Sequence, residues 1–84
     1  MKKSDIEIQA IVNGVSQKEL LDFYDMFEQV TGYVIDSPFI DEKYLKENGK
    51  NTSVVIRSLL SQKLQKEGVD KIMGIFEDVA GIGR

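Results

Sequence analysis

The side chains best placed for chemistry in this sequence are three carboxylates that recur at every third residue, Asp22, Asp25 and Glu28. Residues three apart are neighbours on the surface of a helix, so these carboxylates could together bind a metal ion or exchange protons with a substrate. A carboxylate metal site usually takes further ligands from other elements, or a histidine as in the Glu-x-x-His motif of di-iron bundles. The sequence contains no histidine, and we interpret the three carboxylates as a solvated helix face.

The composition also lacks the other common catalytic groups. The 84 residues include no cysteine and no histidine, which excludes a thiol nucleophile, a zinc–thiolate site and the usual general base near neutral pH. The sequence has neither the G-x-S-x-G motif of serine hydrolases nor the D-x-D-x-D-G motif of calcium loops. We therefore expect a protein that is not an enzyme and that has no metal and no cofactor.

An acidic helix face of this kind is suited to binding another protein. The chain has a formal net charge of -3 and an isoelectric point near 4.8, which disfavours non-specific binding to nucleic acid or to anionic lipid. We predict a non-enzymatic protein–protein interaction module, a small acidic adaptor, inhibitor or regulator that acts through a helical surface. The residues expected on its interaction face are Glu19, Asp22, Asp25 and Glu28.

An alternative function follows from residues 44–60, a segment in which basic residues outnumber acidic ones. This segment resembles a helix-turn-helix in which the first helix ends at Asn48, the turn uses Gly49 and the recognition helix begins near Thr52. The resemblance implies a small DNA-binding transcriptional regulator that acts as a dimer. The residues that it places against DNA are Lys50, Asn51, Thr52, Ser53 and Arg57.

The stretch from Gly49 to Arg57 also resembles the second helix of ribbon-helix-helix repressors, in which Ile6–Val12 would be the strand. Apolar and polar residues alternate at the start of that segment, as they do in a strand. Helical spacing describes the first element equally well and would bury one apolar stripe in the core. The residues of that stripe are Ile8, Ile11, Val12 and Val15. Helix and strand both remain open for this first element.

Capping motifs define the first two elements that must position these residues. Two S-x-x-E capping boxes, Ser4 with Glu7 and Ser16 with Glu19, each predict the start of a helix. The second box opens the clearest helix of the chain, roughly Gln17–Thr31, which we expect to end at the glycine that follows it.

Proline and glycine divide the second half of the chain. The Ser-Pro pair at 37–38 supplies a typical N-cap and first helical residue, and it predicts a short helix over 38–48. A turn over 49–51 then separates this helix from one over 52–67, which the next glycine ends. Asp70 can cap a final helix.

These elements predict an all-α fold, a small bundle of four to five short amphipathic helices that forms a single helical domain over 1–84. We expect residues 80–84 to form a frayed tail. No apolar run approaches the roughly 20 residues that span a bilayer, and the basic start lacks the apolar region of a signal peptide. We therefore expect a cytoplasmic protein, and a homodimer where an apolar stripe is wide enough to pack against a second chain.

Overall fold

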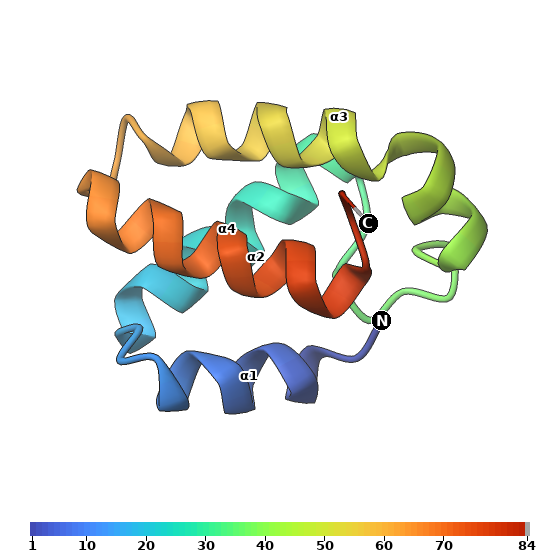
Figure 1. Cartoon of the computed structure of the whole chain (residues 1–84). Coiled ribbons are helices and arrows are strands. Elements are labelled where there is room, and N and C mark those ends of the chain that lie inside the picture. Colours follow the sequence, from blue (N-terminus) through green and yellow to red (C-terminus); the bar gives the residue numbers. More distant parts are fainter. Residues whose placement is uncertain (84) are drawn as a thin grey trace.

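The protein folds as a bundle of four helices, which a computed structural model describes for residues 1–83 (Figure 1). The helices are α1 (Lys3–Val12), α2 (Gln17–Thr31), α3 (Glu42–Leu60) and α4 (Lys66–Ala80). Within residues 1–83 the chain contains no strand, so the predicted all-α fold is confirmed and the first element is a helix. None of the helices in that range is long and apolar enough to cross a membrane.

Helix α4 occupies the centre of the bundle. It packs against each of the other three helices, and α2 also packs against α3. In Figure 1, α4 crosses the middle of the molecule with α3 above it, α1 below it and α2 behind it. Helix α1 therefore joins the bundle mainly through α4.

Three phenylalanines form the middle of the core. The ring centroid of Phe76 in α4 lies 5.3 Å from that of Phe23 and 5.7 Å from that of Phe27, both in α2. All three side chains are fully buried, and aromatic rings at these separations attract each other beyond the effect of burying their area. Helix α1 contributes Ile6 and Ala10 to the same core.

Helix α2 begins and ends where the sequence predicts. The hydroxyl of Ser16 accepts a hydrogen bond from the backbone N–H of Glu19 at 3.2 Å, and the Glu19 carboxylate accepts one from the backbone N–H of Ser16 at 2.9 Å. This capping box satisfies N–H groups that have no partner inside the helix. At the other end, Gly32 adopts a left-handed φ of 81°, which favours glycine. Both predicted limits are confirmed. They could be predicted because both signals act within one turn of the helix end.

The predicted capping box of Ser4 and Glu7 is wrong. Helix α1 begins at Lys3, so Ser4 lies inside its first turn and cannot be its cap. The backbone N–H of Lys3 instead donates to the carboxylate of Asp36, in the connection between α2 and α3, at 2.8 Å. A carboxylate far along the chain therefore takes the place of a local cap.

The predicted break near Gly49 is also wrong. The short helix predicted over 38–48 and the turn after it are replaced by one helix, α3, which starts after Asp41 and continues through Gly49. Asp41 caps α3 by accepting a hydrogen bond from the backbone N–H of Tyr44 at 2.8 Å. Gly49 is buried because Ile82 lies over it, and a Cβ there would be 2.9 Å from Cγ1 of Ile82. This glycine therefore permits close packing rather than a turn.

The start of α4 also differs from the prediction, because a glycine that was predicted to end one helix is packed inside the next. The helix predicted over 52–67 ends at Leu60, and α4 already includes Gly68. Gly68 is buried in the first turn of α4, where the carboxylate of Glu19 leaves no room for a Cβ. Asp70, predicted as the cap of this helix, lies inside it.

The segment after α4 turns back onto α3. Gly81 ends α4 in the left-handed conformation with a φ of 71°, and the side chain of Ile82 then lies over Gly49. Ile82 is half-buried and packs against the core. Residues 81–83 of the tail expected to fray thus form a turn, and Arg84 lies outside the described residues.

Two glycines of α4 allow this packing to be tested. Gly74 is exposed in the middle of α4, and within residues 1–83 no atom outside its own stretch of helix would lie within 4 Å of a Cβ at this position. We expect Gly74→Ala to raise the free energy of unfolding by about 0.5–1 kcal/mol, because alanine favours the helix. Gly68→Ala should raise it less, because the new Cβ meets the Glu19 carboxylate and the end of that side chain must move aside. Urea denaturation measures both variants, and equal stabilisation would contradict the close contact at Gly68.

Candidate functional site

The four carboxylates predicted as an interaction face do not form one surface. Glu19 is half-buried and lies against α4, whereas Asp25 and Glu28 are exposed on α2. Asp25 and Glu28 line a hollow together with Asp36 of the α2–α3 connection. The structure therefore groups these two residues with a carboxylate that was not predicted, and it separates Glu19 from them.

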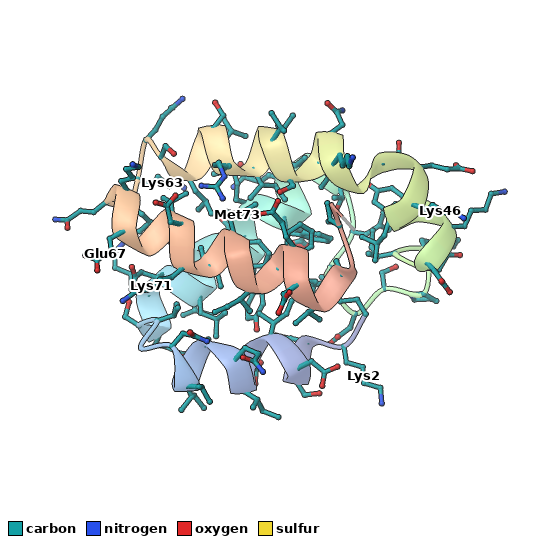
Figure 2. The ribbon with its side chains drawn as sticks, viewed as in Figure 1. Lys2, Lys46, Lys63, Glu67, Lys71 and Met73 are labelled. Carbon is teal, nitrogen blue, oxygen red and sulfur yellow. The ribbon has the colours of Figure 1, made fainter. Side chains whose placement is uncertain are left out.

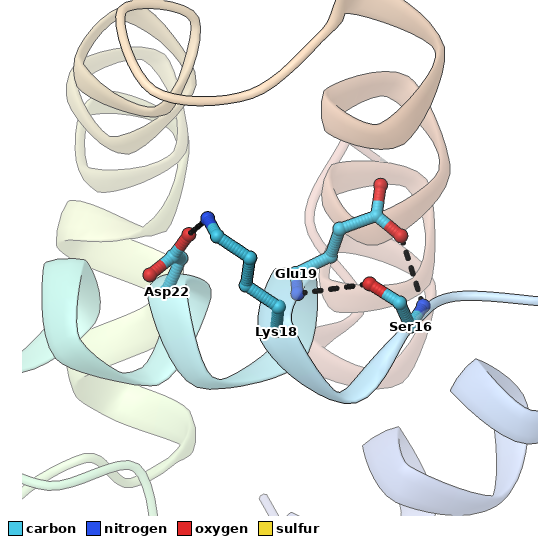
Figure 3. A network of polar contacts seen from close by, with 4 residues as sticks. All are labelled: Ser16, Lys18, Glu19 and Asp22. Carbon is cyan, nitrogen blue, oxygen red and sulfur yellow. Dashed lines mark hydrogen bonds and ion pairs between the residues drawn. The ribbon is translucent and has the colours of Figure 1, made fainter.

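Two of the predicted carboxylates are engaged within the first turns of α2. Figure 3 shows the capping box beside an ion pair in which Nζ of Lys18 lies 2.7 Å from the carboxylate of Asp22. Hydrogen bonds with Ser16 lower the pKa of Glu19. The bond to the Ser16 backbone has the larger effect and the bond to the Ser16 side chain the smaller one, while burial of Glu19 opposes both. Both carboxylates thus have a structural partner within the chain.

The other two carboxylates are more accessible. Asp25 accepts a hydrogen bond from the side-chain amide of Gln29 at 2.9 Å, and within residues 1–83 the carboxylate of Glu28 has no partner. No group of three or more Asp, Glu, Cys or His side chains in the described part of the chain is placed to hold a metal ion. Asp25 and Glu28 therefore act as negative charges at the surface of α2.

Tyr24 joins α1 to α2 next to these charges. Its hydroxyl donates to Glu7 at 3.4 Å, and the ammonium group of Lys3 lies 4.7 Å from the centroid of its ring. Burial raises the pKa of the Tyr24 hydroxyl far above its usual value, and the negative charges of Glu7 and Asp36 raise it further. The hydroxyl therefore stays protonated and remains a hydrogen-bond donor at neutral pH.

The outer side of α1 carries aliphatic side chains that are exposed to solvent. Ile8, Ile11 and Val12 are 57%, 80% and 73% exposed, while Ile6 and Ala10 are the buried residues of this helix. Three residues of the stripe that we expected to pack on the core therefore lie on the opposite side. The fourth, Val15, follows α1, is half-buried and packs against the core as expected. Helical spacing alone cannot distinguish the two sides, because Ile6 and Ala10 are also one turn apart.

Leu21 of α2 extends this apolar surface. It is 53% exposed, and it borders the same hollow between α1 and α2 as Ile11. Figure 2 shows carbon-only side chains that project from α1 on the side away from α4. We call this surface, which was not predicted from the sequence, the α1–α2 apolar face. Its residues are Ile8, Ile11, Val12 and Leu21.

Two of the five residues predicted to contact DNA are buried in the bundle. Thr52 and Ser53 are 5% and 4% exposed, and the Thr52 hydroxyl lies 3.4 Å from the hydroxyl of Tyr44. Lys50 and Asn51 are exposed on α3. The predicted helix-turn-helix does not form, because α3 continues through the residues of its turn.

Arg57, the fifth of these residues, is held by carboxylates of α4. One guanidinium nitrogen lies 2.6 Å from Asp70, and the other lies 3.6 Å from Glu77. The resemblance to ribbon-helix-helix repressors also fails, because Ile6–Val12 lies in a helix instead of a strand. The DNA-binding alternative therefore loses both motifs on which it was based.

Three of the residues predicted to contact DNA do lie together. Lys50, Ser53 and Arg57 line a groove of about 680 Å³ between α3 and the turn that follows α4. Val54 adds an apolar side chain from α3, and Ile82 belongs to the turn. We call this hollow the α3 groove. Like the α1–α2 apolar face, it has the character of a binding site.

Comparisons with known proteins yield no relative. No protein-family model matches the chain, and no curated protein or solved structure shows significant similarity to it. What the protein binds must therefore be inferred from its own surface.

The capping box makes a prediction about the pH dependence of stability. Because the pKa of Glu19 in the folded protein lies below its usual value of 4.5, folding favours the ionised carboxylate. The resulting stabilisation is present above pH 4.5 and is lost as the pH falls below it. We expect Ser16→Ala to lower the free energy of unfolding by about 1 kcal/mol, because it removes the hydroxyl that accepts from the backbone N–H of Glu19. The backbone N–H of residue 16 still donates to Glu19 in this variant, so most of the pH dependence should remain.

The matched control is Ser4→Ala, since Ser4 is an exposed serine inside α1 and was predicted to form the same motif. Urea denaturation across the acid range should show no loss of stability in this variant. Equal losses in both serine variants would contradict the role of the Glu19 capping box.

Proposed function

We propose that this protein is a non-enzymatic protein–protein interaction module and that the α1–α2 apolar face is its binding surface. The observation that supports this most strongly is the exposure of Ile8, Ile11 and Val12 on one short helix. Removing apolar surface from water is favourable by roughly 25 cal/mol per Å². Contiguous exposed apolar patches with polar borders are typical of protein interaction sites.

Carboxylates border this face and indicate the charge of the partner. Asp5 lines a hollow with Ile8, and Glu7 lines another with Ile11. Asp25 continues the acidic border on the exposed side of α2. Complementary charges around an apolar centre speed association and add specificity. We infer a partner that presents an amphipathic helix, apolar along one side and bordered by lysine or arginine.

A second copy of this chain is a poorer occupant of the same face. Two chains that paired through α1 would bring the carboxylates of Asp5 and Glu7 from both copies into one interface. Like charges at such an interface oppose association. The acidic border therefore favours a different protein over the homodimer that the sequence suggested.

A designed helical peptide can test this surface without the natural partner. The probe carries leucine along one side and lysine along its edges, and a second peptide has glutamate in place of each lysine. We expect the lysine peptide to perturb amide signals of α1 and α2 in heteronuclear NMR spectra. Ile11→Ser combined with Val12→Ser should weaken its binding about tenfold or more, because burying each aliphatic side chain contributes about 1.5–3 kcal/mol.

The matched control is Val54→Ser, which removes a comparably exposed aliphatic side chain, 67% exposed, from α3. Circular dichroism confirms that each variant is folded. The proposal is wrong if the glutamate peptide perturbs α1 and α2 as strongly as the lysine peptide, or if Val54→Ser weakens binding of the lysine peptide as much as the double variant. A wild-type dimer that the double variant converts to a monomer would instead assign the face to a second copy.

A further inference from the structure

The α3 groove has the size and the mixture of groups of a small-molecule site. Its volume of about 680 Å³ lies within the range of ligand pockets. Lys50, Ser53, Val54 and Arg57 occur at the spacing of one side of α3, so they are neighbours along one wall. Ile82 belongs to the turn on the other side, where its contact with the backbone of α3 holds it in place.

The hydroxyl of Ser53 is a nearly buried polar group along this wall. Ser53 is only 4% exposed, and its hydroxyl makes no hydrogen bond within residues 1–83. No described side-chain oxygen or nitrogen is both fully buried and without a partner, so the remaining access to this hydroxyl is from the groove that Ser53 lines. A nearly buried hydroxyl without a partner is unfavourable. It is therefore placed to bond to a ligand.

The charges in the groove indicate what kind of ligand this is. The ammonium group of Lys50 is exposed and forms no ion pair within the described range, whereas Arg57 is occupied by Asp70 and Glu77. Lys50 is therefore the cation lining the groove that is free to pair with an anion. Lys50 and Ser53 are three residues apart on α3, so their polar groups can both reach one carboxylate of a bound ligand.

We propose that the α3 groove binds a small amphipathic carboxylate. The carboxylate accepts hydrogen bonds from the ammonium group of Lys50 and the hydroxyl of Ser53, and the apolar body lies between Val54 and Ile82. A phosphate dianion fits less well, because the guanidinium that would complement it is held by two carboxylates, one of which, Glu77, also lines the groove. This proposal uses other residues than the α1–α2 apolar face and stands or falls separately from it.

Sodium octanoate is the probe, titrated into ¹⁵N-labelled protein and followed by heteronuclear NMR. We expect saturable changes at the amide signals of Ser53, Val54 and Ile82. Octan-1-ol, which has the same chain length without the charge, should bind much more weakly. Ile11→Ser combined with Val12→Ser, which alters the other surface, should leave octanoate binding unchanged.

Two variants separate ligand binding from structure. Lys50→Gln should weaken octanoate binding roughly tenfold, because it removes the charge-assisted hydrogen bond. Its matched control, Lys63→Gln, removes the same charge from the α3–α4 connection at the far end of α3 (Figure 2) and should have no effect. Ser53→Ala should weaken binding a few-fold and raise the melting temperature of the protein alone, because it removes an unpartnered hydroxyl from a helix.

Several outcomes would overturn the proposal. These are the absence of saturable change with octanoate, equal binding of octan-1-ol, equal losses in Lys50→Gln and Lys63→Gln, or a lower melting temperature in Ser53→Ala. Spectral changes that lie on α1 and vanish in the Ile11→Ser, Val12→Ser variant would move the ligand to the other surface. A leucine–glutamate peptide that binds the groove when octanoate does not would assign it to a protein partner instead.

Discussion

The contact of Phe76 with Phe23 and Phe27 determines how the bundle is arranged. It joins α2 to α4 at the middle of the core, and α1 and α3 then pack against α4 as well. Helix α1 completes this core with Ile6 and Ala10, one turn apart on a single side. The rest of α1 is left to solvent. The exposure of its aliphatic side chains therefore follows from the position of the helix at the edge of the bundle.

The parts of the fold that could be predicted are those that depend on neighbouring residues. Both limits of α2 were predicted, because its capping box and its C-terminal glycine act within a turn of the helix end. The start of α1 and the continuation of α3 through Gly49 involve contacts between distant residues, Asp36 with the backbone of Lys3 and Ile82 with Gly49. A glycine that admits a side chain from another element cannot be distinguished, in one sequence, from a glycine that ends a helix.

The candidate surfaces could be predicted in residue type but only partly in position. The exposed place of Asp25 and Glu28 on α2 agrees with the sequence pattern, while their neighbour Asp36 comes from a connection that no periodicity describes. Helical spacing identified the aliphatic stripe of α1 but not the side of the bundle on which it lies. Lys50 and Ser53 were predicted as DNA contacts of a helix-turn-helix that does not form. The fold places them in one groove because α3 is continuous there.

Both candidate surfaces border the end of α4, and this shared border relates them physically. Val79 lines a hollow with Ile8 of the α1–α2 apolar face, while Glu77 and Ile82 line the α3 groove. A protein bound to α1 and a ligand bound beside α3 would thus touch the last turns of α4, and the turn at Gly81 that follows them, from two sides. Coupling between two sites requires an element whose arrangement both can bias. In this bundle α4 is an element that both surfaces touch, and it packs against α1 and α3.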